Sequence, residues 1–170
     1  MRKQPWVTSD MRWIRRAALS ILLLAGGYFL STPLSSHVSH ERSAQVRRVV
    51  DGDTVVLTSG ERVRYIGMDT PELHHPRKPV QPYAREAMEY NRNLVEGKVI
   101  RMEFDVDRYD RYGRLLAYVY LSDGTFVNAE LVRQGYAQLL TIPPNVKHTD
   151  LFVKFQREAR ENNRGLWGKR

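Results

Sequence analysis

Three short clusters hold most of the residues whose chemistry suits a phosphate group: DGDT at 51–54, RYIGMDTPE at 64–72 and DRYGR at 110–114. The carboxylates of Asp53 and Asp69 are hard oxygen ligands of the kind that calcium and magnesium prefer. Arg64 and Arg114 carry planar guanidiniums, which bind two phosphate oxygens at once. Glu72, three residues after Asp69, can stand beside a bound metal without binding it and accept a proton from water.

Together these residues meet the needs of phosphodiester hydrolysis. That reaction needs a cation at the non-bridging oxygens, a base for the water and guanidiniums for the charge that grows on the phosphoryl group. Taken singly, each cluster has a structural explanation. Asp51-Gly52-Asp53 is a common turn sequence, the DTPE at 69–72 fits a helix start, and the RYGR at 111–114 fits a turn between strands. Only the combination favours catalysis.

Charge and composition support a nucleic-acid partner weakly. The chain has 170 residues, a length typical of one domain, and a net charge of +8, which favours nucleic acid or membrane as a partner. Much of that charge lies in the first sixteen residues, because from Ala44 onward 21 Lys and Arg stand against 17 Asp and Glu. The absence of cysteine excludes disulfides, thiolate metal sites and a cysteine nucleophile.

The N-terminal segment has the pattern of a targeting element. Fourteen residues from Ala17 to Leu30 contain only Ser20 as a polar residue and follow three arginines. A basic start before a short apolar run is typical of an export signal, and the arginines should stay in the cytoplasm. No clean cleavage site follows, and a spanning helix needs about twenty residues, so a signal peptide and an uncleaved anchor both stay open. We therefore expect a signal peptide or signal anchor at 1–34, a linker at 35–43 and a folded domain at 44–170, secreted, periplasmic or at the cell surface.

The rest of the chain alternates short strands with helices. Strand patterns are expected at 45–57 (bent at 51–53), 62–66, 99–106 and 115–121. In the third of these, Ile100, Met102, Phe104 and Val106 should lie on one face. Helix patterns are expected at 84–95, from a cap at Asn128 to Gly135, and around Phe152 to Gly165, with Leu166 and Trp167 packed back onto the body. The proline-rich 70–82 should be a loop. The pattern favours an α+β fold, a five-stranded OB-fold-like barrel with about three helices.

The three clusters resemble those of the staphylococcal nuclease (thermonuclease) family, in the same order and at nearly the same spacing. The similarity runs from about Gln45 to Trp167 and includes NAELVRQG at 128–135. The resemblance implies a five-stranded barrel with three helices that cleaves DNA and RNA and leaves 3′-phosphate ends. It also implies that Asp53, Asp69 and the backbone carbonyl of Thr70 bind calcium, with Asp51 as a carboxylate near the metal.

The same resemblance implies the remaining roles. Glu72 falls on the proposed general base, and Arg64 and Arg114 fall on the arginines that hold the scissile phosphate. Arg111 and Tyr112 fall on residues that contact the terminal phosphate of the nucleotide.

One departure concerns the pocket for the base. Thr141 or Pro143 lies where an aromatic side chain is expected, in a loop one residue shorter. Because stacking contributes about 1–3 kcal/mol per base, we expect weaker nucleotide binding or a changed base preference. His74 and His75, in the proline-rich loop, are interpreted as solvent-facing residues rather than metal ligands.

The sequence therefore predicts a calcium-dependent endonuclease outside the cytoplasm, with DNA, RNA or both as substrate and a monomer as the default state. The membrane would be a partner only through an uncleaved N-terminal segment. Two alternatives stay open. One is a catalytically silent nucleic-acid-binding module of the same fold, and the other is a membrane-tethered interaction protein whose basic surface meets anionic lipid.

Overall fold

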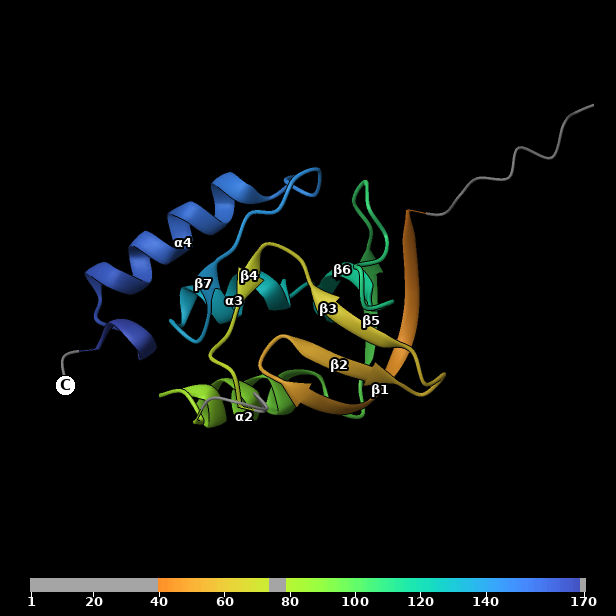
Figure 1. Ribbon diagram of the computed structural model, residues 1–170, viewed down its shortest axis with the longest axis horizontal. Helices are drawn as coiled ribbons and strands as arrows, with labels where there is room; N and C mark the ends of the chain where they lie inside the picture. Colours follow the sequence, from red (N-terminus) through yellow and green to blue (C-terminus); the bar gives the residue numbers. More distant parts are fainter. Residues whose placement is uncertain (1–39, 74–78, 169–170) are drawn as a thin grey trace, which may run out of the picture. The chain divides into compact units, whose positions relative to one another are not determined.

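The computed structural model describes residues 40–73 and 79–168, which belong to one compact unit (Figure 1). The segment expected to be a signal peptide or anchor lies outside the described residues, as do His74, His75, Arg77 and Lys78. Among the described residues, no helix combines the length and the hydropathy needed to cross a membrane.

Five strands close into a barrel in the order β1-β2-β3-β6-β5. They are β1 (Glu41–Asp51), β2 (Thr54–Leu57), β3 (Arg62–Tyr65), β6 (Leu115–Tyr120) and β5 (Val99–Glu103). The pair β3–β6 is parallel and the other pairs are antiparallel. A separate two-stranded ladder joins β4 (Met68–Asp69) to β7 (Gln138–Leu139). The expected barrel is confirmed.

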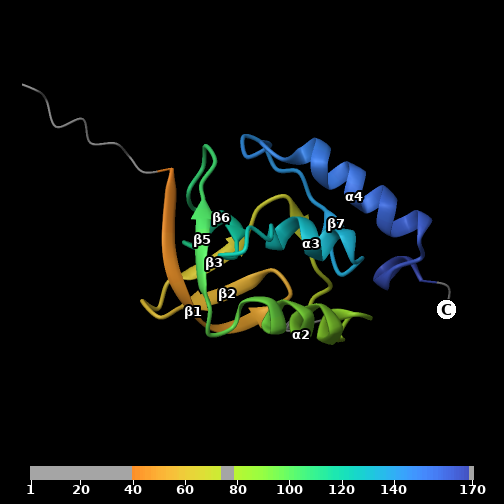
Figure 2. The ribbon, with the colours of Figure 1, turned by 180° about the vertical axis from the view of Figure 1, so that it is seen from behind.

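Within the described residues, three helices pack around the strands. They are α2 (Ala84–Val95), α3 (Val127–Arg133) and α4 (Thr149–Glu161), followed by a 3-10 turn at Gly165–Trp167. Helix α3 packs against α2, α4 and β6, and α2 also packs against β1. Figures 1 and 2 both show α3 between α2 and α4. The backbone N–H of Leu166 donates to the carbonyl of Gly135 at 2.9 Å, and Arg160 stacks on Trp167, so the tail packs onto the body as expected.

The first strand begins earlier than the sequence predicts. Within the expected linker, Arg42 and Ser43 pair with Met102 and Arg101 of β5. The ladder continues here because backbone hydrogen bonds do not require apolar side chains. The residues at this end of β1 are exposed or half-buried, so their sequence has no hydrophobic pattern that would predict a strand. Strand β1 therefore includes Glu41, Arg42 and Ser43, which the sequence places in the linker.

Two other expectations are wrong. Val106 is 69% exposed, because β5 ends at Glu103 and the alternation after it no longer reports which side faces the core. Asn128 does not cap α3, whose cap position is Phe126 without a side-chain bond. Instead, the fully buried Asn128 lies inside the helix and hydrogen-bonds the barrel.

The barrel interior is filled by aliphatic and aromatic side chains from all five strands. The largest fully buried strand residues include Leu57, Tyr65, Ile100 and Met102, whereas Tyr118 lies on the opposite face of β6 from Val119 and packs against Phe126 and Phe152. A packed interior of this kind holds the strand ends, and therefore the side chains that leave them, in one arrangement.

Candidate active site

The turn between β1 and β2 presents Asp53, whose carboxylate is buried with three donors around it. The backbone N–H and the hydroxyl of Thr70 donate to Oδ2 at 3.0 and 2.9 Å, and the hydroxyl of Thr54 donates to Oδ1 at 3.0 Å. Gly52 permits this approach, since a Cβ there would lie 2.7 Å from the Thr70 methyl and 2.9 Å from the Cβ of Ala87. The DGDT cluster and the DTPE cluster are therefore brought together as a unit.

Arg64 joins the two aspartates that the sequence predicts as metal ligands. It lies on β3 with its side chain 14% exposed, and its two terminal nitrogens contact Oδ1 of Asp53 and Oδ1 of Asp69, the latter at 2.5 Å. Burial opposes the charged guanidinium, but the nearby carboxylates outweigh burial and raise the pKa of Arg64. One cation therefore bridges the two carboxylates.

Glu72 is held at the edge of the same site. Its backbone N–H donates to Oε1 of Gln81 at 2.9 Å, and the N–H of Gln81 donates back to the carbonyl of Glu72 at 3.1 Å. The half-buried Glu72 also adds to the field that raises the pKa of Arg64, so its charge acts on the same guanidinium. Asp51 is half-buried at the end of β1, in register with Thr54.

The DRYGR cluster forms a tight turn organised by Asp110. One oxygen of Asp110 accepts the backbone N–H groups of Tyr112 and Arg114 at 2.9 and 3.0 Å, and the other accepts Nε of Arg114 at 2.6 Å. Although burial opposes ionisation of Asp110, these bonds and the charge of Arg114 lower its pKa. The turn leaves Arg111 and Tyr112 exposed at its tip, with Tyr112 68% exposed.

The two arginines expected to hold the scissile phosphate line one cavity of about 580 Å³. Arg64 and Arg114 both line it, and so do Arg111 and Tyr112. Of the expected site residues, these four share the cavity, whereas Asp53, Asp69, Thr70 and Glu72 lie beside it and connect to it through Arg64.

The remaining walls contain residues that sequence reasoning missed. These are Tyr109, Leu140 and Ile142, and they line the cavity together with Pro143, one of the two positions at which an aromatic side chain is expected. The expected aromatic is thus replaced by aliphatic side chains, while Tyr109 adds a ring from the other segment. Thr141 is exposed and is not among the described residues that line the cavity. The feature that distinguishes these apolar residues is their exposure to solvent. The sequence does not show this exposure, because a loop has no regular hydrophobic period from which to predict it.

Asn145, also missed, fastens these two segments to each other. Its side chain is buried, accepts the backbone N–H of Asp107 at 2.8 Å and donates to the carbonyl of the same residue at 2.8 Å. Because both bonds go to one residue, the segment around Asn145 is fixed in direction as well as in distance. The cavity therefore has walls that are fastened together.

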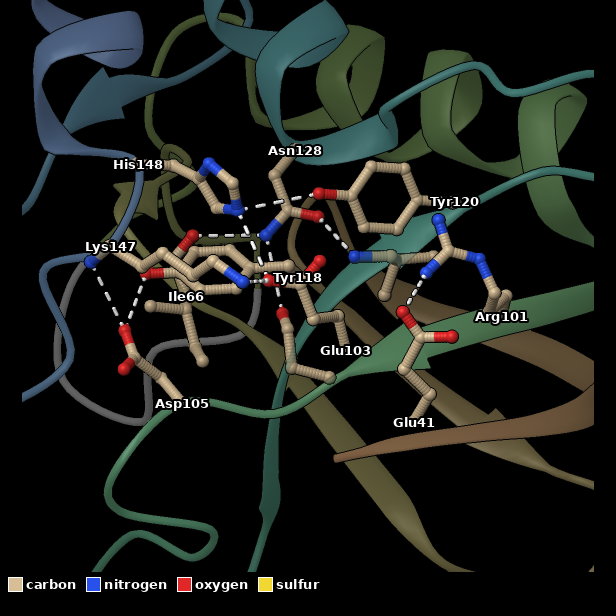
Figure 3. Close-up of polar contacts among 12 residues, drawn as sticks. Glu41, Ile66, Arg101, Glu103, Asp105, Tyr118, Tyr120, Asn128, Lys147 and His148 are labelled. Carbon is tan, nitrogen blue, oxygen red and sulfur yellow. Dashed lines mark hydrogen bonds and ion pairs between the residues drawn. The ribbon is translucent and has the colours of Figure 1, made fainter. Parts of the chain in front are cut away.

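A second network anchors the end of this segment to the barrel (Figure 3). The hydroxyl of Tyr118 and the backbone N–H of Lys147 donate to Asp105 at 2.9 and 3.1 Å. Glu103 pairs with Nζ of Lys147 at 2.7 Å and with Nε2 of His148 at 3.2 Å. The segment that carries the apolar wall is therefore tied to β5 and β6 before α4 begins.

The carboxylate pair fits a hard cation. Asp53 and Asp69 already accommodate positive charge between them, and the Asp69 side chain is 48% exposed, so solvent reaches Asp69. Calcium accepts carboxylates together with carbonyls and water. Among residues 40–73 and 79–168 no three acidic or histidine side chains cluster, so within that part of the chain two carboxylates would supply the charge.

Comparison with known proteins identifies the family of this chain. The model of staphylococcal nuclease homologues matches residues 62–169. The thermonuclease of Staphylococcus intermedius is 41% identical over 125 residues, which cover 72% of this chain and 74% of the relative. The thermonuclease of Staphylococcus hyicus is 36% identical over 144 residues, or 83% of each chain. Endonuclease YncB of Bacillus subtilis (strain 168) is 39% identical over 143 residues, or 81% of this chain and 67% of the relative. With a family match over more than half its length and a barrel that carries the three clusters, this chain belongs to the staphylococcal nuclease family.

Proposed function

We propose that this protein is a calcium-dependent endonuclease that hydrolyses phosphodiester bonds of DNA, RNA or both. The observation that carries the proposal is the position of Arg64, which binds the carboxylate pair and also lines a cavity with a second arginine, Arg114. Relatives named thermonuclease and endonuclease support the same activity.

Asp53, Asp69 and the backbone carbonyl of Thr70 would hold the metal, with Asp51 nearby. When bound, a divalent cation supplies positive charge that neutralises the non-bridging oxygens of the phosphate. The buried Asp53 contributes a carboxylate whose orientation is set by Thr54 and Thr70, so it needs little rearrangement to act as a ligand.

Arg64 and Arg114 bind the scissile phosphate in this proposal. Both guanidiniums line one cavity, and in this structure Arg64 pairs with Asp69 and Arg114 with Asp110. A planar guanidinium can meet two phosphate oxygens and stabilise the charge that develops there during attack. A lysine at either position would offer a single point charge instead.

Glu72 accepts the proton of the attacking water. Its backbone is fixed by the reciprocal bonds with Gln81, and its charge reaches the guanidinium that would hold the phosphate. A positioned base of this kind contributes about 10²–10⁴ in rate. Attack that expels the 5′-oxygen leaves a 3′-phosphate end on one product.

Substrate contacts beyond the scissile phosphate fall to the exposed tip and the apolar wall. Arg111 and Tyr112 would bind the terminal phosphate, and the exposed ring of Tyr109, which lines the cavity, is a candidate to stack on a base. Each base that stacks on an aromatic ring contributes about 1–3 kcal/mol, so the aliphatic Leu140 and Ile142 should hold the base less tightly than aromatic rings would. We further propose export from the cytoplasm and a monomeric state, with membrane contact only through residues 1–34.

The test is cleavage of single-stranded DNA by the full-length chain, with calcium and then with a chelator. We expect cleavage only with calcium, and products with 3′-phosphate ends. Glu72→Gln should lower turnover by about 10²–10⁴ while calcium binding persists. The control Glu161→Gln makes the same chemical change at an exposed position at the end of α4 and should cut at the wild-type rate.

Two outcomes would contradict the proposal. Cleavage by Glu72→Gln at the wild-type rate would remove the general base from the mechanism. Binding of DNA without cleavage, in calcium and in other divalent metals, would show a catalytically silent binding module.

A further inference from the structure

Arg64 places its guanidinium between the two carboxylates that the proposed function assigns to the metal. Its two terminal nitrogens contact one oxygen of Asp53 and one of Asp69, so a single positive group spans the carboxylate pair. A third, longer contact of 3.4 Å runs from the same guanidinium to the carbonyl of Met68. The side chain is thus directed at the acidic residues that the proposed function assigns to the metal.

Asp53 needs such a partner. It is 1% exposed, and its three other bonds come from neutral donors on Thr54 and Thr70. Neutral donors satisfy hydrogen bonding, but a buried carboxylate without a nearby positive charge is strongly disfavoured. Among the described residues, the ion pair with Arg64 supplies that charge.

The same carboxylate oxygens cannot serve a guanidinium and a metal ion equally well. Two cations at one oxygen repel each other, and at this depth the repulsion is only partly screened. The displaced guanidinium would not be idle, because Arg64 already lines the cavity that Arg114 shares. When the Arg64 guanidinium leaves the two aspartates, it therefore becomes available to bind a phosphate in the cavity.

We propose that Arg64 is the resident counter-cation of Asp53 and Asp69 when no metal ion is bound, and that it competes with the metal ion for them. This inference rests on the proposed function and adds a regulation of its site. Free enzyme binds calcium weakly because Arg64 occupies the ligands. A phosphate in the cavity draws the guanidinium away and thereby strengthens calcium binding, and linkage requires that calcium strengthens phosphate binding equally.

The test is calcium titration by calorimetry of the chelator-treated full-length chain, which needs no catalysis. Arg64→Gln removes the competing charge, and we expect its Kd for calcium to fall by about tenfold or more, as the loss of a charge-assisted hydrogen-bond pair implies. Arg64→Lys keeps a charge without the fork and should lie between the two. Arg114→Gln is the matched control, since Arg114 lines the same cavity but pairs with Asp110, and its Kd should stay within about twofold of wild type.

A second measurement covers the case in which Arg64→Gln does not fold without calcium because Asp53 has lost its positive partner. In that case the unfolding temperature of each chain is followed against calcium concentration, and the variant should gain more stability from calcium than the wild type does.

A Kd for Arg64→Gln equal to or weaker than that of a calcium-binding wild type would overturn the inference and leave the proposed nuclease intact. Absence of calcium binding in the wild type and in every variant would overturn both the inference and the calcium part of the proposed function.

Discussion

Truncation of Asn128 should cost a large share of the stability of the domain. Its side-chain oxygen accepts the backbone N–H of Val119 at 2.9 Å, and its amide donates to the carbonyls of Ile66 at 2.9 Å and Ala117 at 3.2 Å. In Asn128→Ala the carbonyl of Ala117 keeps the N–H of Ile66 at 3.0 Å, whereas Val119 N–H and Ile66 C=O lose these partners inside the protein. An unsatisfied buried group costs about 1–3 kcal/mol, so two of them imply roughly 2–6 kcal/mol.

The assay is urea unfolding followed by circular dichroism. With a slope of about 2 kcal/mol/M, the expected loss moves the midpoint down by roughly 1–3 M. Asn93→Ala, at an exposed position of α2, makes the same truncation without buried partners and should stay within about 0.5 kcal/mol of wild type. If Asn128→Ala unfolded within about 0.3 M of the wild-type midpoint, the hydrogen-bond reasoning would be refuted.

Two further predictions concern the frame around the site. Gly67 has φ +82°, and a Cβ there would lie 2.2 Å from Cε2 of Phe152, so Gly67→Ala should lose roughly 2 kcal/mol or more in urea unfolding. Gly60→Ala, with φ +91° and no atom within 4 Å, isolates the backbone strain and should lose only about 1 kcal/mol; equal losses would dismiss the clash. Burial opposes ionisation of Glu103, but its bonds to Lys147 and His148 prevail and lower its pKa. A lowered carboxyl pKa stabilises the fold above the unfolded value of about 4.3, and this contribution disappears as pH falls through the folded pKa. Glu103→Gln should therefore be less stable than wild type at pH 7 and equal to it in strong acid, and an unchanged gap at low pH would contradict the electrostatic cause.

Local patterns predicted most elements of the fold. The helix over Ala84–Val95 and the apolar strand over Leu115–Tyr120 follow from residue spacing, because the periods of helix and strand are properties of the local backbone. The hydrophobic pattern gave a wrong prediction in two places: where a strand has no apolar residues, and where the pattern continues beyond the end of a strand. The polar start of β1 was interpreted as linker, and Val106 was placed in a strand that ends at Glu103.

Asn128 shows why the structural role of one side chain could not be predicted from the sequence. Asparagine before a helical stretch is a common cap, which is a local interaction. Its actual partners belong to β6 and to the residue after β3, and only the folded chain brings them within reach. Asn145 escaped for the same reason, since its partner Asp107 lies in a different segment.

The sequence by itself determined the family, the barrel and the chemical types of the site residues, because carboxylates, guanidiniums and their spacing are written in the chain. The tertiary structure decided how those charges are shared. It placed Arg64 between Asp53 and Asp69 and made the same side chain a wall of the cavity. The cation that neutralises a buried carboxylate is selected by distances of a few ångströms between segments. These distances cannot be predicted from the order of residues along the chain.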